Sequence, residues 1–122
     1  MRLVLAHAIC KREFGHEDVP QSEIDVLRRS MAVELATAIK GEGLPPATRL
    51  LKVYATSSGG ARRIVHLLAV EDGTLFMLFC RSKSDPVGAN ITLKNREFRR
   101  QLHKHLDLLE KAINEGSYSV IE

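Results

Sequence analysis

The chain of 122 residues contains no tryptophan, and its aromatic residues are only four phenylalanines and two tyrosines. A protein that binds single-stranded nucleic acid on a platform of stacked rings needs several exposed aromatic side chains, so this shortage argues against such a platform. No apolar run is long enough for a transmembrane helix. The apolar start, Arg2 to Cys10, is interrupted by His7 and lacks a small-residue cleavage site, so we interpret it as a strand rather than a signal peptide.

Cysteine is also scarce. Cys10 and Cys80 lie far apart within apolar runs, which predicts buried, reduced thiols in a cytoplasmic protein. No zinc-type spacing of cysteine and histidine occurs, and His103 and His105 would point to different faces of a helix. The Gly-x-x-x-x-Gly-Lys phosphate loop, the Gly-x-Ser-x-Gly elbow and the dinucleotide fingerprint are absent. We therefore expect no metal and no cofactor.

The composition is that of one globular domain spanning residues 1–122, with 44% hydrophobic and 27% charged residues. The net charge of +3 is unevenly distributed. Residues 49–104 carry 11 Lys and Arg against 4 Asp and Glu, whereas residues 1–48 carry 6 against 7 and residues 105–122 carry 1 against 4. A concentrated positive charge favours a polyanion or an acidic protein as the ligand, although charges that cluster in sequence need not cluster in space.

The N-terminal half predicts a strand and then a helix. The near-continuous apolar run from Arg2 to Cys10 suits a strand covered on both faces, and a polar loop or ragged short helix follows from Lys11 to Val19. Apolar residues then recur at spacings of three and four from Ile24 to Ala38. This spacing predicts an amphipathic helix of about five turns that ends at Gly41.

Three strand-like runs come next, and the expected ranges are Arg49 to Thr56, Ile64 to Glu71 and Thr74 to Cys80. The Glu-Asp-Gly sequence between the last two is a strong hairpin signal. We expect an antiparallel three-strand meander with the first strand of the chain added at one edge. Alternation places Lys52 and Tyr54 on one face, and it places His66 on an apolar face, which favours a core histidine over a general acid or base.

A second amphipathic helix is predicted from Phe98 to Ile113, terminated at Gly116. Its other side is basic, and it carries Arg96, Arg99, Arg100, His103 and Lys104. Such a stripe is either a solvated helix face or a surface for RNA backbone. The tail from Tyr118 to Ile121 either adds a short strand or packs its apolar residues. The fold class is therefore α+β.

The segment from Ser57 to Arg63, Ser-Ser-Gly-Gly-Ala-Arg-Arg, joins the first two strands of the meander. Its two glycines permit positive φ angles and the close approach of another backbone, such as a phosphodiester chain. Arginine supplies a permanent charge and a planar fork of donors that suits phosphate. The same residues also make an ordinary hairpin with a solvated edge, so the segment alone does not identify a phosphate site.

The run from Ser58 to Ile64 (Ser-Gly-Gly-Ala-Arg-Arg-Ile), followed by a strand, the Glu-Asp-Gly hairpin, another strand and Arg81-Ser-Lys-Ser, resembles the RelE/ParE superfamily of bacterial toxins. The resemblance covers residues 49 to about 84 well and the remainder loosely. It implies a RelE-like domain, in which the meander and an N-terminal strand pack with an N-terminal helical segment and a C-terminal helix. It also implies a cytoplasmic toxin that cuts mRNA on the ribosome as an endoribonuclease and is held inactive by a cognate antitoxin.

The resemblance also indicates site residues. Arg62 occupies the arginine of the Gly-Gly-Ala-Arg segment, Lys52 matches a basic residue of the preceding strand, and Arg81 and Lys83 end the last strand. Cleavage of RNA by its own 2′-hydroxyl requires removal of a proton, stabilisation of charge on phosphorus and protonation of the leaving oxygen. The hypothesis is that Arg62 and Arg81 clamp the phosphate, Lys52 assists proton removal and Lys83 positions the backbone.

Further RNA-binding or ribosome-binding candidates are Tyr54, Arg63, Lys94, Arg96, Arg99 and Arg100. The sequence departs from the family where Cys80-Arg-Ser-Lys stands in place of the usual Tyr-Ala-Lys. The missing aromatic residue leaves base stacking to Tyr54 or Tyr118. Two alternatives remain open. One is the same fold without ribonuclease activity, directed at gyrase or binding only its antitoxin, and the other is a small basic nucleic-acid-binding adaptor domain.

Overall fold

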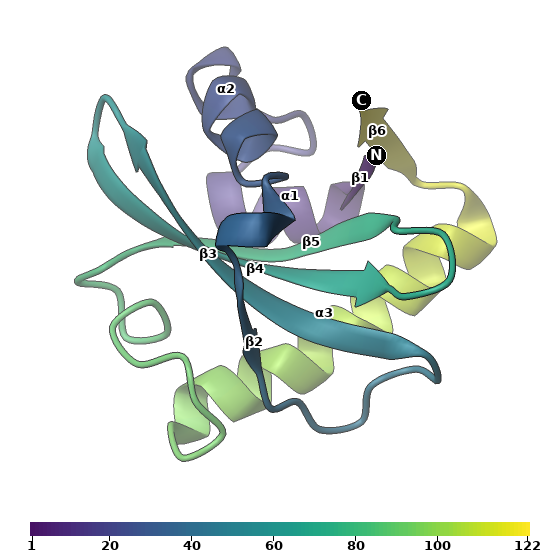
Figure 1. Ribbon diagram of the computed structural model, residues 1–122. Coiled ribbons are helices and arrows are strands. Elements are labelled where there is room, and N and C mark those ends of the chain that lie inside the picture. The colour runs from purple at the N-terminus through teal and green to yellow at the C-terminus, as the bar shows by residue number, and fades with distance from the viewer.

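A mixed sheet of six strands runs through the computed structural model, which describes residues 1–122 (Figure 1). The strands are β1 (Leu3–Ala6), β2 (Thr37–Ile39), β3 (Thr48–Ser57), β4 (Gly60–Ala69), β5 (Leu75–Ser82) and β6 (Tyr118–Ile121), in the sheet order β2-β3-β4-β5-β1-β6. The helices are α1 (His7–Phe14), α2 (Gln21–Arg29) and α3 (Arg96–Glu115), with a 3-10 turn, η1 (Val33–Leu35). The α+β class is confirmed. No helix combines the length and the apolar character that crossing a membrane requires.

The antiparallel meander of β3, β4 and β5 is present, as predicted. Its first hairpin closes between Ser57 and Gly60, and its second turns at Gly73, where a φ of 73° favours glycine. Strand β1 pairs in parallel with β5, so it is added at one edge of the meander, and that expectation is confirmed. The C-terminal tail forms β6 and pairs antiparallel with β1, which places β1 inside the sheet.

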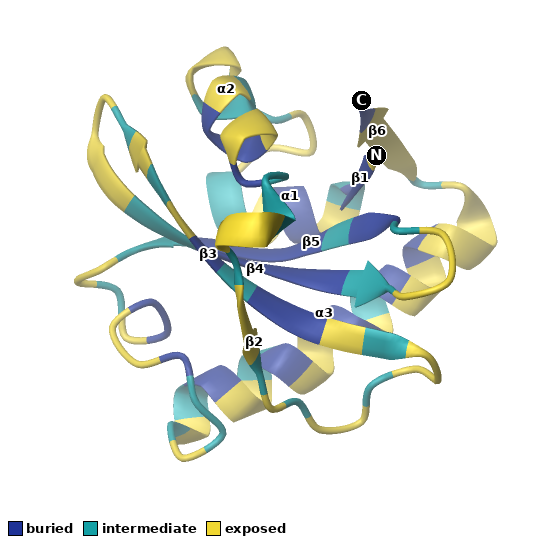
Figure 2. Cartoon of the chain, in the orientation of Figure 1, coloured by how far each residue is buried: buried dark blue, intermediate teal, exposed yellow.

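One row of apolar side chains crosses the whole sheet on a single face, because cross-strand partners share a face. Its members are Ile39, Leu50, Leu67, Phe76, Val4 and Val120, one from each strand. Helix α3 covers this face with Phe98, Leu102, Leu106 and Leu109, all buried. Figure 2 shows this division, with the side of α3 toward the sheet buried and the outer side exposed. The predicted second helix is thus confirmed, and it ends at Gly116.

The predicted five-turn helix from Ile24 to Ala38 was wrong, because α2 ends at Arg29. The hydroxyl of Ser30 donates to the Leu27 carbonyl and lies 2.8 Å from His66 Nε2 on β4, so this residue is fixed against the sheet. The chain then turns through η1, and β2 pairs with β3 at the edge of the sheet. Pairing with β3, the next strand of the chain, therefore outweighs the helical spacing of the apolar residues.

The first strand is also shorter than predicted, since it stops at Ala6 and α1 begins at His7. Because β1 pairs only with the beginning of β5, the outer part of β5 has a free edge. Helix α1 covers that edge, and the Glu13 carboxylate accepts a hydrogen bond from the backbone N–H of Cys80 at 2.8 Å. An acidic side chain thus replaces the missing strand as the acceptor.

Phe98 connects α3 to the sheet, since its side chain is fully buried and its ring centroid lies 5.5 Å from that of Phe79. We expect Phe98→Ala to lower the free energy of unfolding by about 3–5 kcal/mol, because it leaves a cavity between helix and sheet. Urea denaturation followed by circular dichroism measures the loss. Leu35→Ala, at a side chain 76% exposed, is the control and should cost less than about 1 kcal/mol. Equal losses in the two variants would contradict this account of the core.

Candidate nucleic-acid interface

The β3–β4 hairpin contains the Gly-Gly-Ala-Arg-Arg segment. Because β4 begins at Gly60, Arg62 and Arg63 lie within this strand rather than in the connection before it. Tyr54 pairs with Arg63, and Arg63 pairs with Arg81 across β4 and β5. Neighbouring residues of a strand point to opposite faces. Arg63 and Arg81 therefore share the face covered by α3, whereas Arg62 lies on the face covered by α2.

This division corrects the predicted phosphate clamp. Arg62 and Arg81 lie on opposite faces of one sheet, so they do not converge on a single phosphate. Arg62 Nη2 instead bonds Glu23 Oε1 of α2 at 3.2 Å, in an ion pair whose side chains are 21% and 14% exposed. Both arginines lie near strand ends in the sequence, but the sequence does not show the register between β4 and β5 that separates their faces.

Arg81 is held in an internal hydrogen-bond network. Its Nε and Nη2 each donate to Glu13 at 2.7 Å, Nη2 also donates to Gln101 Oε1 at 2.8 Å, and Nη1 donates to Asp85 Oδ1 at 3.2 Å. Its guanidinium also lies 5.7 Å from the centroid of the Phe79 ring. All three guanidinium nitrogens thus have partners within the chain, so Arg81 connects β5 to α1, α3 and the following loop and does not present a free cation.

The Glu13 side chain in this network is 0% exposed. Burial raises the pKa of Glu13, and its hydrogen bonds and charge interaction with Arg81 offset this only in part. Burial alone would lower the pKa of Arg81, but the bonds and charges of Glu13 and Asp85 raise it overall. The guanidinium therefore remains charged.

His105 of α3 lies beside the same network, fully buried and stacked on Phe79 with 4.6 Å between ring centroids. Because arginine can only donate, Arg12 Nε donates to His105 Nε2 at 3.1 Å. Nδ1 therefore carries the proton and donates to the Leu78 carbonyl at 2.7 Å. Burial, assisted by nearby cations, lowers the pKa of His105 to about 4. No local sequence signal predicts this role, since the basic partner lies 93 residues away.

Three predicted RNA-binding or catalytic residues do come together at the open end of the α3-covered face. Tyr54 is 57% exposed, and Lys52 Nζ and Arg63 Cζ each lie 5.4 Å from the centroid of its ring. Arg63 Nη1 donates to the carbonyls of Gly88 and Ala89 at 2.8 and 3.0 Å, while its Nε and Nη2 have no partner in the chain. We call Lys52, Tyr54 and Arg63 the Tyr54 cluster. An exposed ring between two cations can stack a base and bind the adjoining phosphate.

The remaining candidates surround this cluster without joining it. Lys83 is exposed just after β5, and Lys94 is exposed in the loop before α3, where it lines a small pocket with Lys40. Arg96, Arg99 and Arg100 are exposed on the first half of α3, and Arg100 pairs with Glu97 at 2.6 Å. Tyr118 lies on β6, separated from β3 by three strands, so it cannot replace an aromatic residue beside Tyr54.

His66 is a core residue and not part of the cluster, since it is 0% exposed. Burial lowers its pKa to about 4, the bond with Ser30 offsets this only partly, and Nδ1 has no hydrogen-bond partner.

No family model, curated protein or solved structure matches the chain. The candidate site therefore rests on the geometry of its side chains.

We expect Arg81→Met to lower the free energy of unfolding by about 3–5 kcal/mol, because it leaves the buried Glu13 carboxylate without its charge partner. The double variant Glu13→Gln with Arg81→Met should recover part of the loss. Arg100→Met, which breaks a pair 63% and 38% exposed, is the control and should cost less than about 1 kcal/mol. Urea denaturation measures all three, and a double variant that is no more stable than Arg81→Met would contradict the coupling.

The depressed pKa of His66 predicts acid sensitivity. The unfolded chain takes up this proton near pH 6.5 and the folded chain only near 4, so stability present above pH 6.5 is lost as pH falls toward 4. For this one group the loss amounts to about 3 kcal/mol. Urea denaturation from pH 7.5 to 4.5 should show a smaller decline in His66→Leu than in the parent protein. Since His105 and Glu13 titrate in both proteins, parallel curves would show that His66 does not contribute.

Proposed function

We propose that this protein is the toxin of a bacterial toxin–antitoxin pair and acts in the cytoplasm as an endoribonuclease on ribosome-bound mRNA. The observation that carries the proposal is the Tyr54 cluster, an exposed ring with a cation 5.4 Å from its centroid on each of two strands. These strands are the arms of the hairpin formed by the Gly-Gly-Ala-Arg segment, which carries the family resemblance. A cognate antitoxin is the protein partner that this function requires.

The proposed chemistry uses residues of the α3-covered face. The 2′-oxygen attacks the adjacent phosphorus, the bond to the 5′-oxygen breaks, and a cyclic phosphate and a 5′-hydroxyl result. The Tyr54 ring stacks a base and so aligns the phosphate, while Arg63 donates from Nε and Nη2 to phosphate oxygens and stabilises the added charge. Lys52 assists proton transfer, as first expected, and Lys83 contacts the backbone. Arg81 is a positioning residue in this scheme, since its guanidinium is engaged internally.

A second candidate is RNA binding without cleavage, and one observation favours it. His66 of β4 and His105, the α3 histidine stacked on Phe79, are fully buried, and Arg81 is held by Glu13. The exposed cluster thus contains no imidazole or carboxylate to act as a general acid or base. In this case the chain binds RNA on the same surface and leaves it intact.

Binding is tested by fluorescence anisotropy with a labelled single-stranded RNA at several salt concentrations. We expect Tyr54→Ala to weaken binding about tenfold to hundredfold, because it removes one stacking contact. Lys52→Ala and Arg63→Ala should each weaken binding. Each should also reduce the slope of log K against log salt concentration by about 1, because one phosphate contact is lost. Arg28→Ala, at an exposed arginine of α2, is the matched control and should leave binding unchanged.

Cleavage is tested separately by induced expression in bacteria and primer extension on a reporter mRNA. Cuts at in-frame codons that disappear in Lys52→Ala and Tyr54→Ala support the endoribonuclease. Binding without cuts selects the second candidate. A protein that neither binds RNA nor cuts it, or whose Arg28→Ala variant loses as much as the cluster variants, overturns both.

A further inference from the structure

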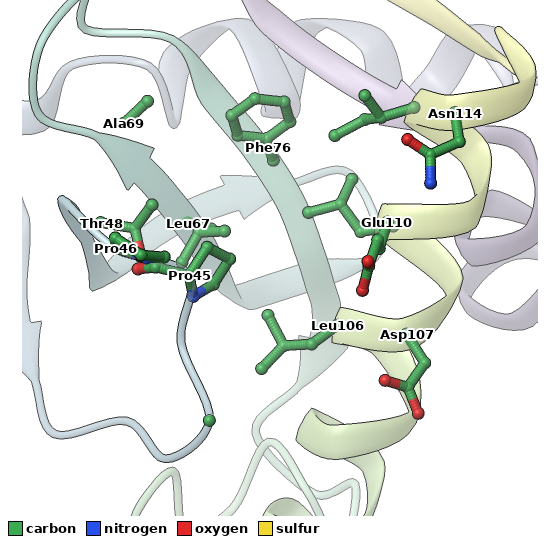
Figure 3. Close-up of a pocket in the computed structure, with 13 residues that line it drawn as sticks. Pro45, Pro46, Thr48, Leu67, Ala69, Phe76, Leu106, Asp107, Glu110 and Asn114 are labelled. Atoms are coloured by element: carbon green, nitrogen blue, oxygen red, sulfur yellow. The ribbon is translucent and has the colours of Figure 1, made fainter.

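A groove of about 550 Å³ opens between the sheet and the second half of α3 (Figure 3). The sheet wall is Leu67, Ala69 and Phe76, and the helix wall includes Leu106, Leu109 and Ile113. The segment before β3 forms a third wall with Pro45 and Pro46. Ile113 is 45% exposed although it faces other apolar side chains. The groove is therefore an accessible apolar surface that the chain itself leaves uncovered.

The charge of the groove is opposite to that of the protein. Its lining contains two carboxylates, Asp107 and Glu110, and no lysine, arginine or histidine, although the chain has a net charge of +3. Both carboxylates are exposed on α3, and neither forms an ion pair within the chain. Figure 3 shows their side chains on the helix that borders the groove. A ligand that suits this surface combines apolar side chains with positive charge.

The shape of the groove indicates an elongated occupant. Its helix wall follows α3 from Leu106 to Ile113, which is two turns or about 10 Å. The groove is also partly open to solvent, unlike a closed cavity for a small molecule. His103 bonds Glu42 at 2.9 Å beside Gly43, which ties the third wall to α3. The third wall is thus connected to α3 before any partner binds, which lowers the cost of binding.

We propose that this groove binds an amphipathic helix of a partner protein, with apolar residues in the groove and lysine or arginine beside them pairing with Asp107 and Glu110. Apolar side chains at helical spacing anchor such a helix, and the charges fix its orientation. The inference is independent of the proposed function. On β4 the groove begins at Leu67, four residues or roughly 13 Å from Arg63 of the Tyr54 cluster. A bound helix therefore leaves the cluster free.

The test uses a synthetic helical peptide of about four turns, made of alanine, leucine and lysine, with leucine at every third or fourth position. Backbone amide shifts of the isotope-labelled full chain are measured by NMR during titration. We expect saturable shifts at Leu67, Phe76, Leu106 and Ile113 and little change at Tyr54. The same peptide with glutamate in place of lysine should bind at least tenfold more weakly, and RNA affinity in the anisotropy assay should not change.

Charge reversal in the protein supplies the decisive comparison. Asp107→Lys with Glu110→Lys should weaken binding of the lysine peptide at least tenfold and improve binding of the glutamate peptide. Asp25→Lys with Glu34→Lys makes the same charge change at exposed residues outside the groove and should have little effect. Equal loss in the two double variants, equal binding of the two peptides, or dimerisation of the free chain through the groove in ultracentrifugation would each overturn the proposal.

Discussion

The ion pair between Arg81 and Glu13 is the interaction on which the arrangement of the molecule depends. A buried carboxylate is tolerated only where its charge and its hydrogen-bonding capacity are satisfied. Here the guanidinium satisfies Glu13 from α1, and it also bonds Gln101 from α3. The pair thus fixes α1 along the free edge of β5 and holds α3 against the same strand. No other side chain in the chain bonds to this many separate elements.

The same network extends to the candidate interface. Arg81 holds Asp85, whose carboxylate accepts the backbone N–H groups of Val87 and Gly88. Gly88 packs so closely that an added Cβ would lie 2.1 Å from the Ser82 carbonyl oxygen, so no larger residue fits there. The carbonyls of Gly88 and Ala89 then orient Arg63 beside Tyr54. Arg81, whose guanidinium is engaged within the chain, therefore helps to set the geometry of Arg63, which keeps two nitrogens without a partner.

Features that depend on neighbours in sequence were predictable. The alternation of β3, β4 and β5 and the Asp-Gly turn gave the meander, and the apolar spacing from Phe98 to Ile113 gave α3. Features that depend on distant partners were not. The end of α2 is set by Ser30 meeting His66, and the role of Arg81 is set by Glu13, 68 residues away. Alternation did separate Arg62 from Arg63, yet only the register between β4 and β5 shows that Arg81 shares the face of Arg63.

The position of β1 inside the sheet has a consequence for how the chain folds. Leu3 pairs with Leu75 on one side and with Ile121 on the other, and the two ends of the chain lie side by side in Figure 1. During synthesis β1 keeps one open edge until the last strand has left the ribosome. Contacts between such distant segments slow folding, because a long loop must close before they form. Strand β6 thus covers the open edge of β1 and protects it from pairing with another chain.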